Sequence, residues 1–526
     1  MNNTLEKKYS KLTSDRSPYL DQAYRASELT VPFLIPRNRN IKDSANSNAV
    51  VPTPWQSVGS IGLNNLSNKL LLTTFPPNHP FHKLAINDFT ALDILNDEEA
   101  RAAVEEAFSA VERTTKDFVE RSGIRPPMEE AFKHMLVAGN ILIHRLDDGG
   151  IEIFHMDQYV VERDPNGKVR QIIIEEIHTF ASLDHEIQVE LSLAGKKPED
   201  DETRLSMFTS IRKQDDNKNW KVSQEILGIK VVADPNKDSF KDAENPWFAL
   251  RFHSIKGANW GRSYISGLLG DLEDLETLYK SVIQGAEAMA MILFLIKPGS
   301  NIRPDSIIKK KNGGFVLGNK EDLGVLQMEK FADFKIALEL IDRLTRRIQR
   351  AMLQDDAITR DAERVTLGEI RLMASRLEEA LGGFYSIFTQ EFQLPYLKLT
   401  TKDMERKGQL PKLPGDVKFI IITGLDALGR NSEAEQLRLY IEELTSTIGP
   451  ELVNQIVKPI AFAKRLGAAK GIDTKGLVVS EEEWKQMKQQ AMQQQMAEKL
   501  GPAGIKGGID LAKQASDQDA QQEEGV

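Results

Sequence analysis

The chain has 526 residues, of which 40% are hydrophobic and 28% charged, and its formal net charge is -10. This composition supports a folded core and excludes a chain that is disordered throughout. Because there is no cysteine, disulfides, thiolate metal sites and a cysteine nucleophile are excluded. The acidic balance also argues against a sequence-specific DNA reader, which normally presents a basic face.

No membrane segment or targeting signal is expected. The opening stretch, MNNTLEKKYSKLTSDR, is polar throughout and lacks the basic and apolar regions of a signal peptide. The longest apolar run, Ala288–Ile296, is far shorter than the ~20 residues that a membrane helix needs. We therefore expect a soluble chain made in the cytoplasm.

The first quarter of the chain is predicted to be helical. Apolar residues at helical spacing, with glycines or prolines at the ends, predict four helices: Leu5–Leu29, Trp55–Phe75, Asp97–Arg121 and Pro127–Ala138. From Ile141 to Phe252 the pattern changes to short alternating runs rich in β-branched residues. Turn signals at Asp147–Gly150 and Asp164–Gly167 separate them, so we predict a mostly antiparallel sheet.

Two long amphipathic helices are predicted to flank a small insert. The first begins near Ile265 and is expected to continue to Lys297-Pro298-Gly299. The second begins at Phe331, and its apolar positions recur every three or four residues: Phe334, Ala337, Ile341, Leu344, Ile348 and Met352. The insert between them is glycine-rich and strand-like. This order predicts a helical hairpin with the insert at its tip.

Two basic features lie on this hairpin. A stripe on the second helix consists of Arg343, Arg346, Arg347 and Arg350, and the insert carries Lys309, Lys310 and Lys311. In a monomer, an ordinary solvated helix face with i,i+4 partners such as Glu339 and Asp342 accounts for the stripe. Neither feature has interleaved aromatic residues, so any nucleic-acid contact is expected to be to the backbone, without sequence readout.

The region after Met352 loses the helical pattern over Leu353–Arg364. Thr366 and Glu369 form a capping box, which predicts a new helix that Pro395 should end. An extended stretch at Val417–Thr423 and several short helices up to Val478 follow. Ser480 and Glu483 predict one more helix start, and the segment from 501 to 526 is rich in Gly, Gln and Asp, which predicts disorder.

An enzyme is the main alternative from another functional class. Phosphate-binding glycine loops and the H-E-x-x-H pattern are absent from the sequence, and Ser263 is best explained as part of a helix start. His144 and His155 could face each other across the Asp147–Gly150 hairpin. A magnesium-dependent nuclease would have to use Asp355, Asp356 and Asp361, which more simply form a solvated acidic loop.

The order of these parts resembles the bacteriophage portal proteins, the head-to-tail connectors, of autographivirus-type podoviruses. The segments that carry the resemblance occur in the family's order along nearly the whole chain: Thr53–Pro76, Val137–Ile143, Gln158–Val169, Asn259–Glu276, Glu363–Pro395, Thr423–Arg430 and Gly471–Leu477. The C-terminal tail is shorter than in the family, and the loops at Lys196–Asn219 and Asp234–Asn245 diverge. A ring-forming capsid or adaptor protein without a channel is the remaining alternative.

The resemblance implies an α+β portal fold with a mainly helical wing containing an antiparallel sheet, a two-helix stem, a small α/β clip and a helical crown. Its implied boundaries are wing 1–264, stem helix 265–295, clip 296–330, stem helix 331–352, tunnel loop 353–365, long wing helix and return strand 366–426, crown 427–479, and a C-terminal helix and disordered tail 480–526.

The resemblance also implies a non-enzymatic function without cofactor, metal or membrane. A homo-oligomeric ring, normally a dodecamer, would sit at one vertex of the virion after assembly in the host cytoplasm. Double-stranded DNA would pass through it, contacting Arg343, Arg346, Arg347, Arg350 or the tunnel residues Arg360 and Arg364. Lys309–Lys311 would contact DNA or a partner at the clip. The implied partners are the terminase large subunit, a tail adaptor, major capsid and scaffolding proteins, and internal core proteins.

Overall fold

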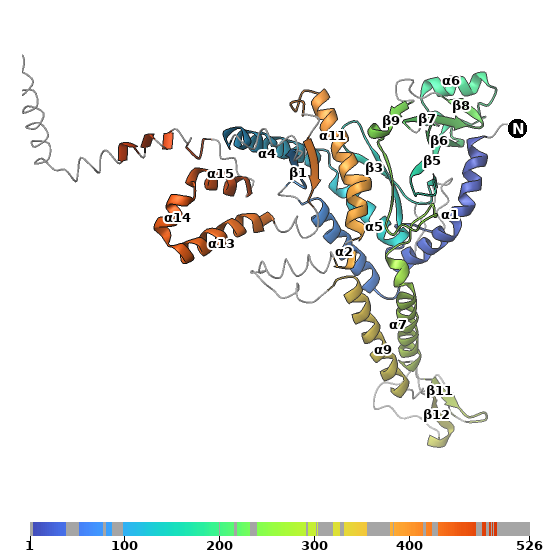
Figure 1. Ribbon diagram of the computed structural model, residues 1–526. Coiled ribbons are helices and arrows are strands. Elements are labelled where there is room, and N and C mark those ends of the chain that lie inside the picture. Colours follow the sequence, from blue (N-terminus) through green and yellow to red (C-terminus); the bar gives the residue numbers. More distant parts are fainter. Residues whose placement is uncertain are drawn as a thin grey trace, which may run out of the picture. The chain divides into compact units, whose positions relative to one another are not determined.

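The computed structural model describes most of the chain in two compact units, 1–427 and 428–526. The described residues are 4–37, 52–76, 80–86, 98–198, 200–214, 218–231, 239–290, 293–300, 302, 319–326, 331–354, 379–381, 383–413, 417–422, 430–469, 476–479, 483–484, 486–487 and 489–491. Helices and antiparallel sheets are mixed in the first unit, as the predicted α+β class requires (Figure 1).

The first unit begins with a helix and contains eight α-helices among its described residues. Their bounds are α1 Leu5–Glu28, α2 Val58–Thr74, α4 Glu98–Arg121, α5 Arg125–Ala138, α6 His185–Leu193, α7 Leu269–Ala290, α9 Phe331–Ala351 and α11 Leu394–Arg406. The second unit contains α13 Arg430–Ile448, α14 Pro450–Ile456 and α15 Pro459–Ala469. None of the helices in these described ranges is long and apolar enough to cross a bilayer.

All strand pairs in the described chain are antiparallel and form four sheets. The largest has the order β4-β5-β6-β7-β8, with β9 also paired to β7, and a second has the order β10-β2-β3. Two smaller sheets pair β1 with β13 and β11 with β12. The strands are β1 His82–Ile86, β2 Asn140–Arg145, β3 Ile151–Phe154, β4 Tyr159–Arg163, β5 Val169–Thr179, β6 Arg204–Lys213, β7 Asn219–Ile226, β8 Ile229–Val231, β9 Ser239–Lys241, β10 Trp247–Arg251, β11 Leu293–Ile296, β12 Leu323–Leu326 and β13 Val417–Ile421.

One hydrophobic core joins the N-terminal helices, the sheets and the helix that leads into α11. At its centre, Phe132 of α5 packs against Phe384 and Phe388, whose ring centroids lie 6.2 and 5.3 Å away. Phe392 continues the aromatic row toward Phe248 of β10. All five rings are buried, so they contribute on the order of 1.5–3 kcal/mol each from area removed from water.

A polar junction connects this core to the helix pair α7–α9. Asn140 accepts a hydrogen bond from the Gly261 N–H (2.7 Å) and donates one to the Gly261 carbonyl (2.9 Å). Gly139, which caps α5 in the left-handed conformation at φ 73°, packs directly on the backbone of Arg262 and Ser263. The crossing of these two segments fixes the point where the chain turns into α7.

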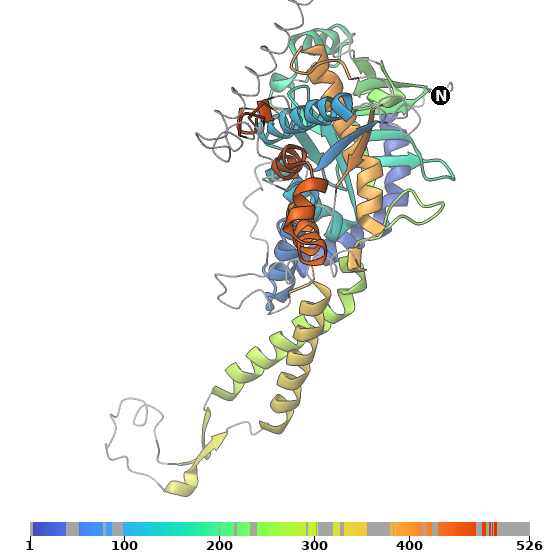
Figure 2. The ribbon, with the colours of Figure 1, turned by 60° about the vertical axis from the view of Figure 1, so that its left-hand side comes forward.

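The α7–α9 pair extends from the rest of the first unit. Figures 1 and 2 show the two helices side by side, with α2 near the end of α9 and the β11–β12 hairpin at the far ends of both. The chain therefore travels out along α7, turns through β11 and β12, and returns along α9. This arrangement agrees with the predicted helical hairpin with an insert at its tip.

One boundary in that prediction is wrong. The first long helix was expected to extend to residue 295, but α7 ends at Ala290 and Leu293–Ile296 forms strand β11. β11 pairs with β12 in register from Leu293↔Leu326 to Ile296↔Leu323. A short run of leucine, phenylalanine and isoleucine is compatible with either a helix or a strand. Here the run forms a strand because β12 is available to pair with it.

Pro395 does not end its helix, contrary to the prediction. The described helix before it widens into a π-helical turn at Thr389–Gln393, and α11 begins at Leu394 with Pro395 in its first turn. The helical backbone continues through Pro395, and the π-helical turn just before α11 shifts the hydrogen-bond pattern, which accommodates a residue without an N–H. The capping box at Thr366 and Glu369 and the one at Ser480 lie outside the described residues.

The first testable consequence concerns Gly139. We expect Gly139→Ala to lower the free energy of unfolding by about 3 kcal/mol or more, because a Cβ would add left-handed strain and lie 2.5 Å from backbone atoms of Arg262 and Ser263. Gly123→Ala is the matched control: φ is 68° but nothing lies within 4 Å, so only about 1 kcal/mol is expected. Urea unfolding at one fixed chain concentration measures both. Equal losses would show that the junction is not tightly packed.

Candidate functional site

The inward face of α9 holds the helix pair together. Ile341, Ile348 and Met352 are buried, and Leu344 is half-buried against the same core. These residues follow the predicted apolar stripe, and they pack α9 against α7 and α2. The opposite face of α9 is therefore the one available to other molecules.

The predicted arginine stripe lies outside that buried face, on the exposed surface of α9. Arg343, Arg346 and Arg347 are exposed, with 72%, 68% and 63% of their side-chain surface accessible. Arg343 pairs with Glu339 at 2.8 Å and Arg346 with Asp342 at 2.8 Å, which confirms the predicted i,i+4 partners. Arg350 is also exposed, and among the described residues it has no ion-pair partner.

Arg347 differs from the other arginines because it bridges the two helices. Its Nε donates to the Asp271 carboxylate of α7 at 2.6 Å, and its Nη2 contacts the other carboxylate oxygen. Asp271 is only 19% exposed. A two-point guanidinium–carboxylate contact of this kind fixes relative orientation as well as distance. Arg347 is therefore partly a structural residue of the helix pair.

The same outward stripe changes from apolar to basic along the helix. Ile336, Leu340, Arg343, Arg347 and Arg350 follow one another at spacings of four, three, four and three, so they share one side of α9. Ile336 is 62% exposed and Leu340 is 43% exposed. The predicted stripe contains only the arginines, although the spacing alone places Ile336 and Leu340 on the same side of α9.

Most acidic side chains on the first half of α7 are already engaged within the chain. Glu273 pairs with Arg25 of α1, and Glu276 accepts hydrogen bonds from the backbone N–H groups of Trp55 and Gln56 at 2.9 and 3.2 Å. Asp274 is exposed and has no ion-pair partner within the described part of the chain. The base of α7 is thus fixed to the N-terminal helices.

Three side chains fix the end of α9. The Tyr264 hydroxyl donates to the Ala351 carbonyl at 2.5 Å, and Asn65 and Lys69 of α2 both donate to the Leu353 carbonyl. Leu353 adopts a left-handed conformation with φ 54°. Partial burial raises the pKa of Tyr264, so its hydroxyl stays protonated and remains a donor at neutral pH.

Close packing reinforces this attachment. Met352 is fully buried beside Gly62 of α2, where an added Cβ would lie only 2.1 Å from the methionine sulfur. The absence of a side chain at Gly62 therefore allows α2 and the end of α9 to approach closely. The end of α9 is the most firmly held point of the pair.

Several predicted site residues lie outside the described residues. They are Lys309, Lys310, Lys311, Arg360, Arg364 and the three aspartates of the nuclease alternative, Asp355, Asp356 and Asp361. The expectation that His144 and His155 face each other is wrong. His144 pairs in register with Glu152 and stacks on Trp247, whereas His155 stacks on His134. Within the described ranges no group of three or more His, Asp or Glu side chains could hold a metal ion.

Comparison with known proteins gives the family. The model of the bacteriophage head to tail connecting protein family matches residues 2–478. The chain belongs to this family. It is 33% identical to the portal protein of Escherichia phage T7 over 514 residues, covering 97% of this chain and 94% of that protein. The portal protein of Enterobacteria phage T3 is 32% identical over 504 residues, with 95% and 92% covered.

These relatives support portal function and a structural rather than enzymatic role. The portal protein of Enterobacteria phage SP6 is also 30% identical over 502 residues, covering 94% of this chain and 93% of that protein. Among solved structures, a chain from the neck of a native gene transfer agent particle aligns with 78% of this chain and 89% of that one. Its identity is 12% and the TM-score 0.36, which is too low to support a structural argument.

The contact between Arg347 and Asp271 gives the second prediction. In a double-mutant cycle with Arg347→Ala and Asp271→Ala, we expect a coupling of about 0.5–1 kcal/mol in the free energy of unfolding. The coupling should fall at 1 M salt because Arg347 is mostly exposed. Arg350→Ala, which removes an arginine that has no ion-pair partner among the described residues, should change stability by less than about 0.5 kcal/mol. A coupling near zero would mean that the ion pair does not stabilise the helix pair.

Proposed function

We propose that copies of this chain form a ring, normally of twelve subunits, around a channel through which double-stranded DNA enters and leaves a phage capsid. The α7–α9 pair is the main structural support for this proposal. It combines a buried inward face, a strongly held base, and an outward stripe that carries both exposed apolar residues and arginines. A single chain does not cover Ile336 and Leu340, and a neighbouring helix pair in a ring would.

In this proposal the parts of the chain have the family's roles. Residues 1–264 form the wing, α7 and α9 the stem, and 296–330 the clip at the tip. Residues 353–365 form the tunnel loop, 366–426 complete the wing, 427–479 form the crown, and 480–526 the C-terminal segment. The separation of 428–526 as its own compact unit is compatible with a distinct crown.

The outward arginines suit a DNA path. A ring would repeat Arg343, Arg346, Arg347 and Arg350 around the axis, so phosphates of any sequence would meet the same guanidinium groups. Arg350 is the strongest candidate for such a contact because it has no partner within the described chain. Tight binding would stall a moving duplex, and the chain's net charge of -10 opposes it.

We place Arg360 and Arg364 of the tunnel loop at the narrowest point of the DNA path, and Lys309–Lys311 at the clip, where they would contact DNA or a docking partner. The proposed partners are the terminase large subunit during packaging, then the tail adaptor, together with the major capsid, scaffolding and internal core proteins. The proposed location is the portal vertex of the virion, after assembly in the host cytoplasm.

Direct imaging and mass measurement of the purified chain test ring formation. We expect annular particles with a central hole and a mass that is a multiple of the 59.1 kDa subunit. Replacing Ile336 and Leu340 with Asp should reduce assembly, because it would bury charges against a neighbouring stem. Particles that stay monomeric at all concentrations would contradict the proposal.

The nuclease alternative predicts magnesium-dependent DNA cleavage, and we expect none.

The third prediction concerns the tunnel-loop arginines. Replacing both Arg360 and Arg364 with Ala should lower the DNA retained in filled heads several-fold, because two guanidinium contacts per subunit are removed at the proposed constriction. Quantifying packaged DNA from heads assembled with the variant measures this. The control is Arg170→Ala with Arg212→Ala, which removes two exposed arginines from β5 and β6. Unchanged retention in the loop variant would refute the grip at Arg360 and Arg364.

A further inference from the structure

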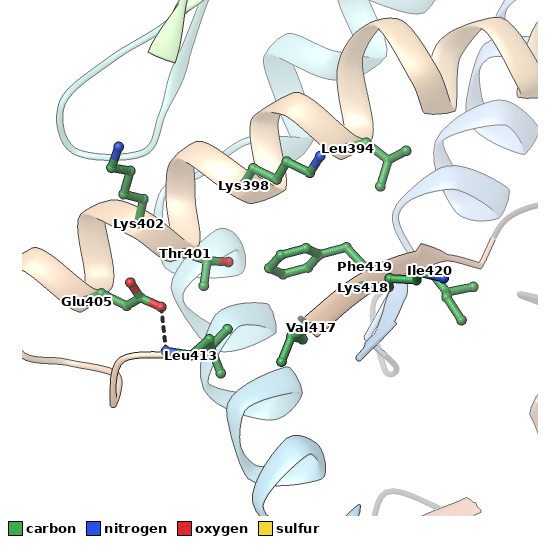
Figure 3. Close-up of a pocket in the computed structure, with 10 residues that line it drawn as sticks. All are labelled: Leu394, Lys398, Thr401, Lys402, Glu405, Leu413, Val417, Lys418, Phe419 and Ile420. Carbon is green, nitrogen blue, oxygen red and sulfur yellow. Dashed lines mark hydrogen bonds between the residues drawn. The ribbon is translucent and has the colours of Figure 1, made fainter. Parts of the chain in front are cut away.

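A groove lies between helix α11 and strand β13, away from the α7–α9 pair (Figure 3). Its volume is about 620 Å³, within the range of protein ligand sites. The side chains that line it share two properties, because most are either apolar or basic: Leu394, Lys398, Thr401, Lys402, Glu405, Leu413, Val417, Lys418, Phe419 and Ile420. None of the roles proposed for the portal uses this groove.

Strand β13 forms one wall of the groove, and one of its edges has no strand partner among the described residues. Within the described chain, β13 pairs with β1 alone. The Ile422 N–H donates to the Phe81 carbonyl, so the residues Ile422 and Phe81 form a hydrogen-bonded pair of the antiparallel ladder. Backbone groups alternate in an antiparallel pair, so those of Val417, Phe419 and Ile421 point away from β1. They form a row of donors and acceptors along the edge of β13 that faces away from β1.

The apolar part of the groove is continuous with a small core. Val417 and Phe419 pack on a cluster that includes Leu84 of β1, Val111 of α4 and Met404 of α11, so the core covers one face of β13. Figure 3 shows the Phe419 ring directed toward Thr401 across the groove. Ile420, by contrast, is 50% exposed. A supported, rigid edge with exposed apolar surface beside it is suited to accept another strand.

The charges of the groove indicate what kind of strand fits. Lys402 is neutralised by Glu244, and Glu405 accepts a hydrogen bond from the Leu413 N–H at 3.0 Å. Lys398 and Lys418 are exposed and have no ion-pair partner in the part of the chain that is described. Among the described residues, the groove therefore has two positive charges without an ion-pair partner, one on each wall.

We propose that this groove binds an extended acidic segment of a partner protein, which adds to β13 as a third strand. Backbone hydrogen bonds to β13 supply affinity, and the lysines select a segment in which carboxylates alternate with apolar residues. The five residues of β13 span roughly 17 Å, so about five residues of the partner are engaged. This inference does not depend on ring formation or on DNA passage.

Peptide binding to the full-length chain tests the proposal. The probe is a fluorescent decapeptide of alternating Val and Asp, compared with a decapeptide of alternating Val and Lys. Anisotropy should show saturable binding of the acidic peptide and none of the basic one. The double variant Lys398→Glu with Lys418→Glu should weaken binding by about tenfold or more, because two attractions become repulsions.

The matched control keeps the same charge change outside the groove. Lys412→Glu with Lys230→Glu alters two exposed lysines, one near α11 and one on β8, and should leave the affinity within about twofold. Equal weakening in both double variants would show general charge attraction and overturn the proposal. So would an absence of saturable binding of the acidic peptide at millimolar concentration.

Backbone methylation separates strand addition from charge attraction. An added strand donates to β13 through every second amide, so methylating one alternating set of peptide amides should abolish binding while the other set is tolerated. Equal tolerance of both sets would overturn the strand-addition model. If the lysine variant instead changed the oligomeric state of the chain, a second copy would be the occupant and the assignment to another protein would be wrong.

Because the natural chain has no cysteine, a single introduced thiol reports position without background. Ile420→Cys places a thiol on the exposed side of β13. A peptide with one cysteine should form a disulfide with it at one peptide position much faster than at the two neighbouring positions, since neighbouring side chains of a strand point to opposite faces. Uniform rates along the peptide would contradict a fixed register.

Discussion

The arrangement of the first unit depends on one polar contact, the exchange of two hydrogen bonds between the Asn140 side chain and the backbone of Gly261. It joins the start of β2 to the segment that enters α7, more than a hundred residues later. Space at the crossing is minimal: a Cβ on Gly261 would lie 2.8 Å from the Arg251 Cβ and 3.0 Å from the Gly139 carbonyl oxygen. The amide of asparagine satisfies both backbone groups in a buried site where leaving either unpaired would cost about 1–3 kcal/mol.

The geometry of the helix pair follows from this junction and from the contacts at its base. Arg25, Trp55 and Gln56 fix α7 through its acidic side chains, while Tyr264, Asn65 and Lys69 fix the last residues of α9. Further along, the helices are held chiefly by each other. The pair is therefore anchored where it meets the rest of the first unit, and its outer part carries exposed apolar side chains.

Hydrophobic periodicity predicted those helices and strands that keep one face toward the same neighbour along their whole length. Helix α9 was predictable because Ile341, Ile348 and Met352 repeat at helical spacing and face the same neighbour throughout. Alternation and turn residues likewise predicted most strands between Asn140 and Ile226. The strand at Leu293–Ile296 was not predictable in this way, because its partner, Leu323–Leu326, lies near the other end of the insert. The pairing of β1 with β13 joins segments more than three hundred residues apart, and no local pattern encodes it.

The sequence predicted which arginines the candidate site contains, but it did not predict which carboxylate pairs with Arg347. The sequence identified the arginines of α9, yet the carboxylate that Arg347 uses lies on α7, at Asp271, which no spacing rule on one helix identifies. The difference matters for the proposed channel. Three of the four described arginines already share their charge with a carboxylate, so the surface offered to DNA is a row of ion pairs rather than a row of bare cations. Such a row attracts phosphates at short range but falls off quickly with distance. A moving duplex would therefore make only weak, short-lived contacts with these arginines. Because DNA must not bind tightly while it moves, paired arginines suit the proposed channel better than an unpaired basic stripe.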